Sequence, residues 1–176
     1  MPGLLDPLPH AADHTAGPEG AHHVMTMYAD FECPFCQAAQ SILPRVRKRL
    51  DGDLLFVFRH LPVSERHPLA MGAADAAEAA AAQGAFWAMH DALFELRGDL
   101  ERPALVKAAN ALGLDLPRFE ADLDSRAHRS RIEADVASAE RSGVTGTPAF
   151  FAGTTQVGGA FDAGSLVDAL RASKPR

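Results

Sequence analysis

Apolar residues follow two periods in the first third of the chain, and each period predicts a kind of element. Residues 24–31 (VMTMYADF) and 53–61 (DLLFVFRHL) are short runs with β-branched and aromatic members, typical of buried strands. Between them, apolar residues recur at helical spacing, at Ala39, Ile42, Leu43, Val46 and Leu50. Pro44 lies within this stretch and is expected to kink the helix. The pattern predicts a βαβ unit with parallel strands and a right-handed crossover.

The rest of the chain reads as a block of helices, a hairpin and a last helix. Residues 68–142 are successive helical segments separated by Gly, Pro and Ser, without a convincing strand. Strand character returns at 147–153 and 155–161, and the short turn around Gly153 predicts a β-hairpin. Residues 162–173 are predicted to form a terminal helix.

This order divides the chain into four segments. Residues 1–22 are expected to be an irregular lead-in, 23–63 a βαβ half, 64–142 a helical insertion, and 143–176 a ββα half. The length of 176 residues suits one domain that carries a sizeable insertion.

Charge and composition exclude several classes of protein. The net charge of −6 and the isoelectric point of about 5.7 argue against nucleic acid or an anionic membrane surface as partner. No apolar run approaches the roughly 18 residues that span a bilayer, so we expect no membrane insertion. The first residues lack the pattern of a secretory signal, which favours the cytoplasm. A periplasmic or other extracytoplasmic location is the alternative, if a leader has been removed.

The two cysteines of the chain, Cys33 and Cys36, carry the candidate chemistry. A disulfide between them closes a very small loop and would contribute little stability. A zinc site would need two further ligands, and the adjacent His22 and His23 point in opposite directions on an extended segment. Metal binding is therefore possible but unsupported, and we assign no metal ligands.

A redox role explains more of the local sequence. At the start of a helix, unpaired N–H groups and the helix dipole favour a thiolate, so Cys33 is the expected nucleophile, with a lowered pKa. Cys36, one turn later, is the expected buried resolving thiol. Pro34 suits the first helical turn, and Phe35 offers the Cys33 sulfur no charge or hydrogen bond. Glu32 should oppose ionisation if it lies close.

Two carboxylates beside the cysteines are candidates for proton transfer. Asp30 ends the first strand and could move protons to or from Cys36, or could equally cap the helix. Glu32 is the second candidate, by its position next to Cys33.

At these residues the chain resembles the DsbA-like thiol–disulfide oxidoreductases of the thioredoxin-fold superfamily. YADFECPFC (28–36) is similar to the active-site signature of that family, and GVTGTPAFFAG (143–153) to its Gly-Thr-Pro segment. The likeness extends over roughly residues 22–172. It implies an α/β, thioredoxin-like fold, with an all-helical insertion between the second and third strands.

The resemblance also implies roles for single residues. Thr147–Pro148 would be a cis peptide beside Cys33, and Pro148 would block metal capture by the cysteine pair. The backbone of Thr147, with Pro34 and Phe35, would then receive an extended substrate segment. Partners would be polypeptide thiols and disulfides, and a redox partner protein or glutathione. No cofactor is implied.

Several alternatives stay open at the level of the sequence. Phe35 stands where the best-known periplasmic members carry histidine, so the direction of exchange is undetermined. One rival is a glutathione-dependent transferase or isomerase on the related fold. The others are a non-enzymatic metal carrier that uses both thiols and a peptide-binding chaperone. We expect a monomer.

Overall fold

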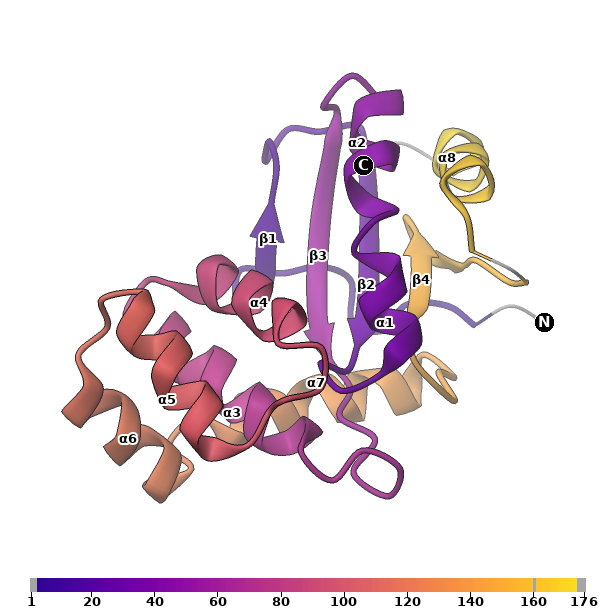
Figure 1. Ribbon diagram of the computed structural model, residues 1–176. Helices are drawn as coiled ribbons and strands as arrows, with labels where there is room; N and C mark the ends of the chain where they lie inside the picture. Colours follow the sequence, from indigo (N-terminus) through magenta and orange to yellow (C-terminus); the bar gives the residue numbers. More distant parts are fainter. Residues whose placement is uncertain (1–2, 160, 174–176) are drawn as a thin grey trace.

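A five-stranded mixed sheet forms the centre of the molecule (Figure 1). The computed structural model describes residues 3–159 and 161–173. The strands are β1 (His14–Ala16), β2 (His23–Ala29), β3 (Leu54–His60), β4 (Ala149–Ala152) and β5 (Thr155–Gln156), in the spatial order β1-β3-β2-β4-β5. The pair β2–β3 is parallel and the other pairs are antiparallel. The predicted βαβ unit and the β4–β5 hairpin are therefore confirmed.

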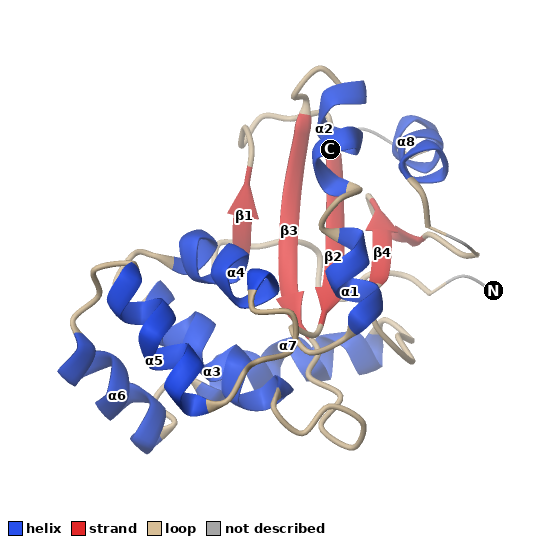
Figure 2. Ribbon diagram, in the orientation of Figure 1, coloured by secondary structure: helices blue, strands red, loops and turns tan. Residues whose placement is uncertain are grey.

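Helices cover the sheet and gather beyond one of its ends (Figure 2). Three helices belong to the thioredoxin-like part of the chain. Helices α1 (Pro34–Ala39) and α2 (Leu43–Arg49) connect β2 to β3, and α8 (Ala163–Ala172) follows β5. The helices between β3 and β4 are α3 (Ala70–Ala81), α4 (Phe86–Glu95), α5 (Arg102–Ala111), α6 (Leu116–Ser125) and α7 (Arg129–Arg141). They gather near the carboxyl ends of β2 and β3 (Figure 1). The predicted α/β, thioredoxin-like fold with a helical insertion is confirmed.

The lead-in is more ordered than its sequence predicts. Its residues His14–Ala16 form β1, which pairs with β3 so that His14 faces Phe58. The indole N–H of Trp87, on α4, donates to the Thr15 carbonyl oxygen at 2.8 Å. The expectation of a wholly irregular lead-in was wrong. Three residues are too few to show alternation, and β1 forms because β3 offers an unpaired edge.

The helix after the first strand is interrupted instead of kinked. Helix α1 ends at Ala39 and α2 begins at Leu43, with Pro44 in the first turn of α2. At that position the missing N–H of proline costs no intrahelical bond, so Pro44 starts a helix. The second strand of the hairpin is also shorter than the predicted 155–161, because β5 holds only Thr155 and Gln156.

The core lies between the sheet and the helices and is rich in aromatic rings. Phe31 packs on Phe58 and Phe94, with ring centroids 5.4 and 4.9 Å apart. A charged pair is also buried: Arg59 of β3 donates to both carboxylate oxygens of Asp13, at 2.9 and 3.0 Å. Each side chain is at most 1 % exposed. The pair ties the lead-in to the centre of the sheet.

Candidate active site

Cys33 and Cys36 lie where β2 passes into α1, at the carboxyl end of the central parallel strands. Cys33 is the N-cap residue of α1, with extended backbone, and Pro34 occupies the first turn. Both thiols are free. Cys33 is 3 % exposed and Cys36 is 0 % exposed. Only Cys33 therefore presents any surface to a reactant.

The surroundings of the two thiols move their pKa values in opposite directions. A hydrogen bond from the Cys36 thiol has the largest effect on the pKa of Cys33, and burial works against it. Hydrogen bonds from the Thr147 side chain and from the backbone N–H groups of Cys36 and Phe35 add to the lowering, and the pKa of Cys33 falls to about 5. Burial, followed by the neighbouring Cys33, raises the pKa of Cys36 far above its ordinary value. The expected lowering at Cys33 is confirmed.

The segment that opens β4 lies against Cys33. Thr147–Pro148 is a cis peptide, as the family resemblance implies. The Cys33 thiol donates to the Thr147 carbonyl oxygen, with 3.5 Å between sulfur and oxygen. Both Thr147 and Pro148 are half-buried. The structure thus brings together residues that are 114 positions apart in the chain.

Phe35 is an apolar side chain left on the surface beside the cysteine pair. It is 65 % exposed, and Pro34 next to it is exposed as well. Both residues belong to the first turn of α1, directly after Cys33. The face around Cys33 therefore offers apolar contact area to a bound molecule.

The carboxylates of Asp30 and Glu32 accept hydrogen bonds from backbone N–H groups. The buried Asp30 accepts from the N–H of Glu32 at 2.8 Å and of Val63 at 2.9 Å. Glu32 accepts from the Leu69 N–H at 2.7 Å, just before α3. Helix α1 has no side-chain cap, so the capping role considered for Asp30 was wrong. Proton transfer by either carboxylate stays a prediction.

His67 follows the second predicted strand, at the active-site end of the sheet, and the structure makes it a neighbour of the site. Its Nδ1 donates to Asp30 at 2.7 Å, and its side chain is 20 % exposed. Asp30 follows β2 and His67 follows β3, the parallel neighbour of β2. The sequence signal for this pair is an acidic residue after one strand and a histidine after its parallel neighbour. The loops that follow parallel neighbours leave the sheet at the same end, so their side chains can meet.

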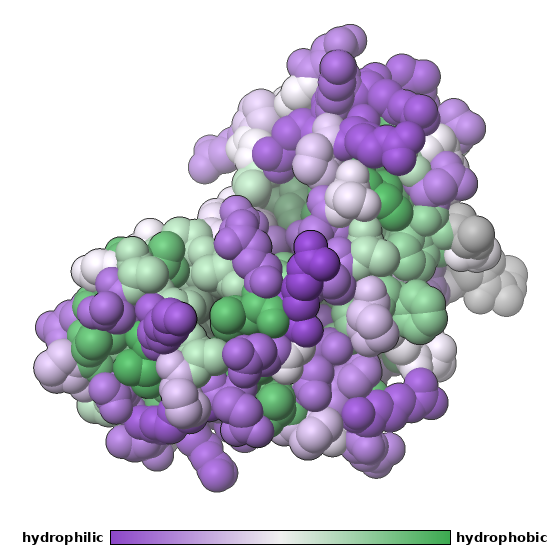
Figure 3. Space-filling model, viewed as in Figure 1, coloured by the Kyte–Doolittle hydropathy of each residue, from purple (hydrophilic) through white to green (hydrophobic). Residues whose placement is uncertain are grey.

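A groove of about 920 Å³ runs beside the cysteine-bearing helix. Gln37 and Gln40 line it from the α1 side, Arg47 from α2, and Trp87 and Phe94 from α4. Figure 3 shows a recess with apolar side chains at its floor between the two lobes of the molecule. The groove adds a second apolar surface near the cysteine-bearing helix.

A thioredoxin-like sheet with two cysteines at the start of its first helix defines the class of proteins that includes the thiol–disulfide oxidoreductases. The family model described as thioredoxin matches residues 10–172, and the chain belongs to this family. The resemblance drawn from the sequence is therefore confirmed.

The curated relatives that match this chain are longer proteins. It is 42 % identical over 175 residues to a Na(+)/H(+) antiporter NhaA of Herminiimonas arsenicoxydans. It is 41 % identical over 175 residues to Na(+)/H(+) antiporter NhaA 1 of Mycolicibacterium vanbaalenii. The matches cover 99 % and 97 % of this chain but only 28 % of each relative. The chain thus spans little more than a quarter of these relatives.

Solved structures show the same fold over nearly the whole chain. A thioredoxin-like oxidoreductase from Silicibacter pomeroyi superposes with a TM-score of 0.82 and 25 % identity, covering 92 % of both chains. BdbD from Bacillus subtilis gives a TM-score of 0.80 at 20 % identity, over 97 % of this chain and 95 % of the other. Wolbachia pipientis α-DsbA1 gives 0.77 at 21 % identity, over 94 % and 92 %.

Within residues 3–159 and 161–173, every helix is too short or too polar to cross a membrane.

Proposed function

We propose that this protein exchanges disulfides with polypeptide substrates through Cys33 and Cys36. The observation that carries the proposal is the position of Cys33 at the N-cap of α1 beside a buried second thiol, which lowers the pKa of Cys33 to about 5. At neutral pH Cys33 is then a thiolate, which is the species that attacks a disulfide. The alternatives considered from the sequence do not need this difference between the two thiols.

The exchange takes two steps. The Cys33 thiolate attacks one sulfur of a substrate disulfide, a bond forms between Cys33 and that sulfur, and the other substrate sulfur leaves as thiolate. Cys36 then loses its proton and attacks the Cys33 sulfur, which releases the substrate dithiol and leaves a Cys33–Cys36 disulfide. The reverse sequence oxidises a substrate dithiol. Two electrons move between protein and substrate in either direction.

The second step requires a group that removes the Cys36 proton, because the pKa of that thiol is raised. We assign this role to Asp30, the buried carboxylate that precedes the cysteine loop. Its hydrogen bond to the partly exposed His67 offers the proton a path to water. The Glu32 carboxylate accepts from the Leu69 N–H and, among the described residues, has no hydrogen bond from a histidine, so its contacts give the same role less support.

The surface around Cys33 suits an extended polypeptide. The half-buried Thr147 lies against the Cys33 sulfur, and its backbone would pair with a substrate strand. The exposed Phe35 and Pro34 would contact apolar side chains of that strand. Pro148 follows Thr147 across a cis peptide and would keep a metal ion from the cysteine pair.

The pKa of Cys33 also bears on the direction of exchange. A thiol pKa of about 5 lies between the values of about 7 in thioredoxin and about 3.5 in DsbA. A stabilised thiolate favours the reduced form and makes the couple more oxidising. We therefore expect a reduction potential between about −270 mV, the value of thioredoxin, and about −120 mV, the value of DsbA. Cytoplasmic location and a monomeric state stay predictions of the sequence.

Trapping of the intermediate tests the proposal. Cys36→Ser is expected to accumulate a covalent adduct with a disulfide-bonded polypeptide, detected by mass and reversed by dithiothreitol. Cys33→Ser is the matched control and should form none. Turnover that needs glutathione and survives Cys36→Ser would support the transferase or isomerase reading instead. Chaperone activity alone would survive replacement of both cysteines.

A further inference from the structure

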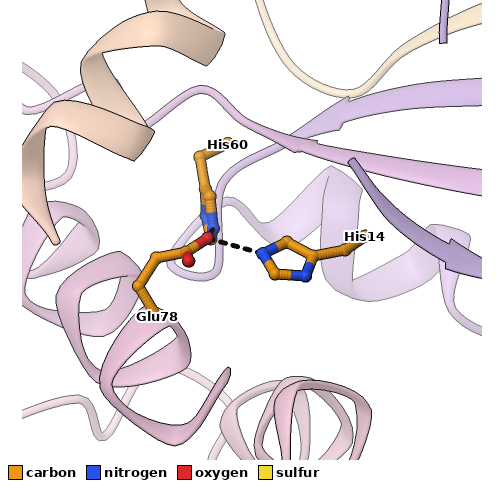
Figure 4. A group of neighbouring side chains, drawn as sticks. All are labelled: His14, His60 and Glu78. Atoms are coloured by element: carbon orange, nitrogen blue, oxygen red, sulfur yellow. Dashed lines mark hydrogen bonds and ion pairs between the residues drawn. The ribbon is translucent and has the colours of Figure 1, made fainter. Parts of the chain in front are cut away.

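A second cluster of reactive side chains lies outside the cysteine site. His14 of β1, His60 at the end of β3 and Glu78 of α3 converge on one point (Figure 4). His14 Nε2 donates to Glu78 Oε1 at 2.7 Å, and His60 Nε2 donates to the same oxygen at 2.8 Å. One ligand atom from each of the three residues lies within 4.8 Å of the others.

The cluster is enclosed by the fold. The side chains of His14, His60 and Glu78 are 16 %, 1 % and 7 % exposed. The His14 ring stacks on Phe86, with centroids 3.4 Å apart. His60 packs edge-on against Phe58 at 5.2 Å. The three ligand atoms are thus held by packed rings and by three separate elements, as a binding site requires.

We propose that His14, His60 and Glu78 form a binding site for a divalent transition-metal ion, with Zn²⁺ as its natural occupant. Two imidazole nitrogens and one carboxylate oxygen are a common three-ligand set for zinc, with water in the fourth position. This site is independent of the proposed disulfide exchange. It departs from the sequence analysis, which assigned no metal ligands.

The distances between the three ligand atoms allow a zinc ion to bind after a small movement of the side chains. Zinc holds nitrogen and oxygen ligands at about 2.0–2.2 Å, so tetrahedral ligand atoms stand roughly 3.3 Å apart. The present nitrogen–oxygen distances of 2.7 and 2.8 Å would open by about half an ångström as the ion replaces the two shared protons. Each imidazole would bind the ion through Nε2 and carry a proton on Nδ1.

The charge balance also favours a cation. The Glu78 carboxylate is 7 % exposed, and one of its oxygens accepts from both imidazoles. The carboxylate therefore places a negative charge where the Nε2 atoms of His14 and His60 meet. Among the described residues, His60 Nδ1 is buried without a hydrogen-bond partner. A proton moved onto it would stay unpaired, so we expect a dissociation constant on the order of micromolar rather than nanomolar.

An ion bound here would stabilise the end of the sheet from which the cysteine loop leaves. His60 pairs in register with Ala29, directly before Asp30 and the cysteine loop. Glu78 belongs to the insertion, and His14 to the lead-in. The ion would therefore join three segments that are far apart in the sequence. An ion that binds only the folded state raises the melting temperature, by roughly 5–10 °C at a hundredfold excess over the dissociation constant.

Zinc titration of the full chain tests the proposal, with Cys33 and Cys36 both replaced by Ser so that no thiolate competes. We expect one Zn²⁺ per chain by calorimetry and the stated rise in melting temperature. In the same background, Glu78→Gln and His14→Gln should weaken binding about tenfold or more. The control is His22→Gln, which alters an exposed histidine–carboxylate pair with Asp53 and should leave binding unchanged.

A direct location keeps the test independent of how the variants fold. Crystals of the zinc-treated chain should show an anomalous peak between His14, His60 and Glu78. The proposal would be overturned if no zinc bound at concentrations up to about 100 times the expected micromolar dissociation constant. An anomalous peak elsewhere in the molecule would also overturn it. So would equal binding by the folded Glu78→Gln and His22→Gln variants.

Discussion

The Cys33 sulfur lies 3.5 Å from the carbonyl oxygen of Thr147. This contact joins the start of α1 to the segment that opens β4, on the two sides of the helical insertion. It places the expected nucleophile next to backbone that could pair with a substrate. The predictions below follow from this arrangement and from the buried groups around it.

Replacement of Cys36 by Ala should raise the pKa of Cys33 by one unit or more. The Cys36 thiol has the largest lowering effect on this pKa, which is about 5 in the intact pair. The pH dependence of the rate of alkylation by iodoacetamide measures it. Thr147→Val, which removes a weaker hydrogen bond, should give a smaller rise. An unchanged midpoint in Cys36→Ala would contradict the assigned cause.

The stability of the reduced protein should rise with pH relative to that of the oxidised protein. The pKa of Cys33 is about 5 in the folded reduced state and about 8.5 when unfolded. The thiolate contribution is therefore absent below pH 5, grows as pH rises, and is complete only above the unfolded pKa. Between pH 5 and pH 8 we expect a relative gain on the order of 3 kcal/mol.

Guanidinium unfolding of the two redox forms at several pH values measures this gain. Cys33→Ser carries no thiolate at this position, so the pH dependence of its free energy of unfolding should match that of the oxidised protein. If the free energies of unfolding of the reduced and oxidised forms changed in parallel between pH 5 and pH 8, Cys33 would titrate with an ordinary pKa.

Phe35→Ser should weaken the binding of polypeptide substrates without altering the thiol. The side chain is 65 % exposed beside Cys33, so its loss removes apolar contact area and leaves the core intact. We expect KM to rise about fivefold, with kcat and the pKa of Cys33 unchanged. Leu8→Ser is the matched control, since Leu8 is 55 % exposed and belongs to the lead-in. An equal effect of both variants would refute a specific contact.

Asp30→Asn should slow the second step of exchange and spare the first. The variant keeps a side chain that can bond to Val63 and His67 but loses the carboxylate as a proton acceptor. Stopped-flow measurement should show normal attack by Cys33 and release of substrate slowed at least tenfold. Glu32→Gln is the control and should change neither step, because among the described residues that carboxylate has no histidine partner to pass the proton on. Normal release in Asp30→Asn would exclude Asp30 as the acceptor.

Asp13→Ala should destabilise the fold by about 3–5 kcal/mol, because it leaves the buried Arg59 without its partner. The exposed pair His22–Asp53 provides the comparison, and Asp53→Ala should not measurably change stability. Urea unfolding of both variants decides the matter. A small effect of Asp13→Ala would show that the lead-in is not held by this pair.

Local sequence predicted the architecture because its signals are local. Buried strands and the helices between them appear as periodic apolar runs, and the predicted strands 24–31 and 53–61 differ from β2 and β3 by at most two residues at either end. The lowered pKa of Cys33 also follows from local features, because Cys36 and the first-turn N–H groups lie within three residues of it. The short strand β1 was missed because its pairing partner is remote.

The amino-acid sequence by itself determined the order of the elements after β1, the position of the cysteine pair at a strand-to-helix junction, and the family. Only the tertiary structure decided which distant groups meet. It brought His67 to Asp30, Asp13 to Arg59, and His14 and His60 to Glu78. The physical reason is that a buried polar group must find a partner wherever the packed chain supplies one, at any separation in sequence. Periodicity reports which face of an element is buried, but not which side chain it will meet there.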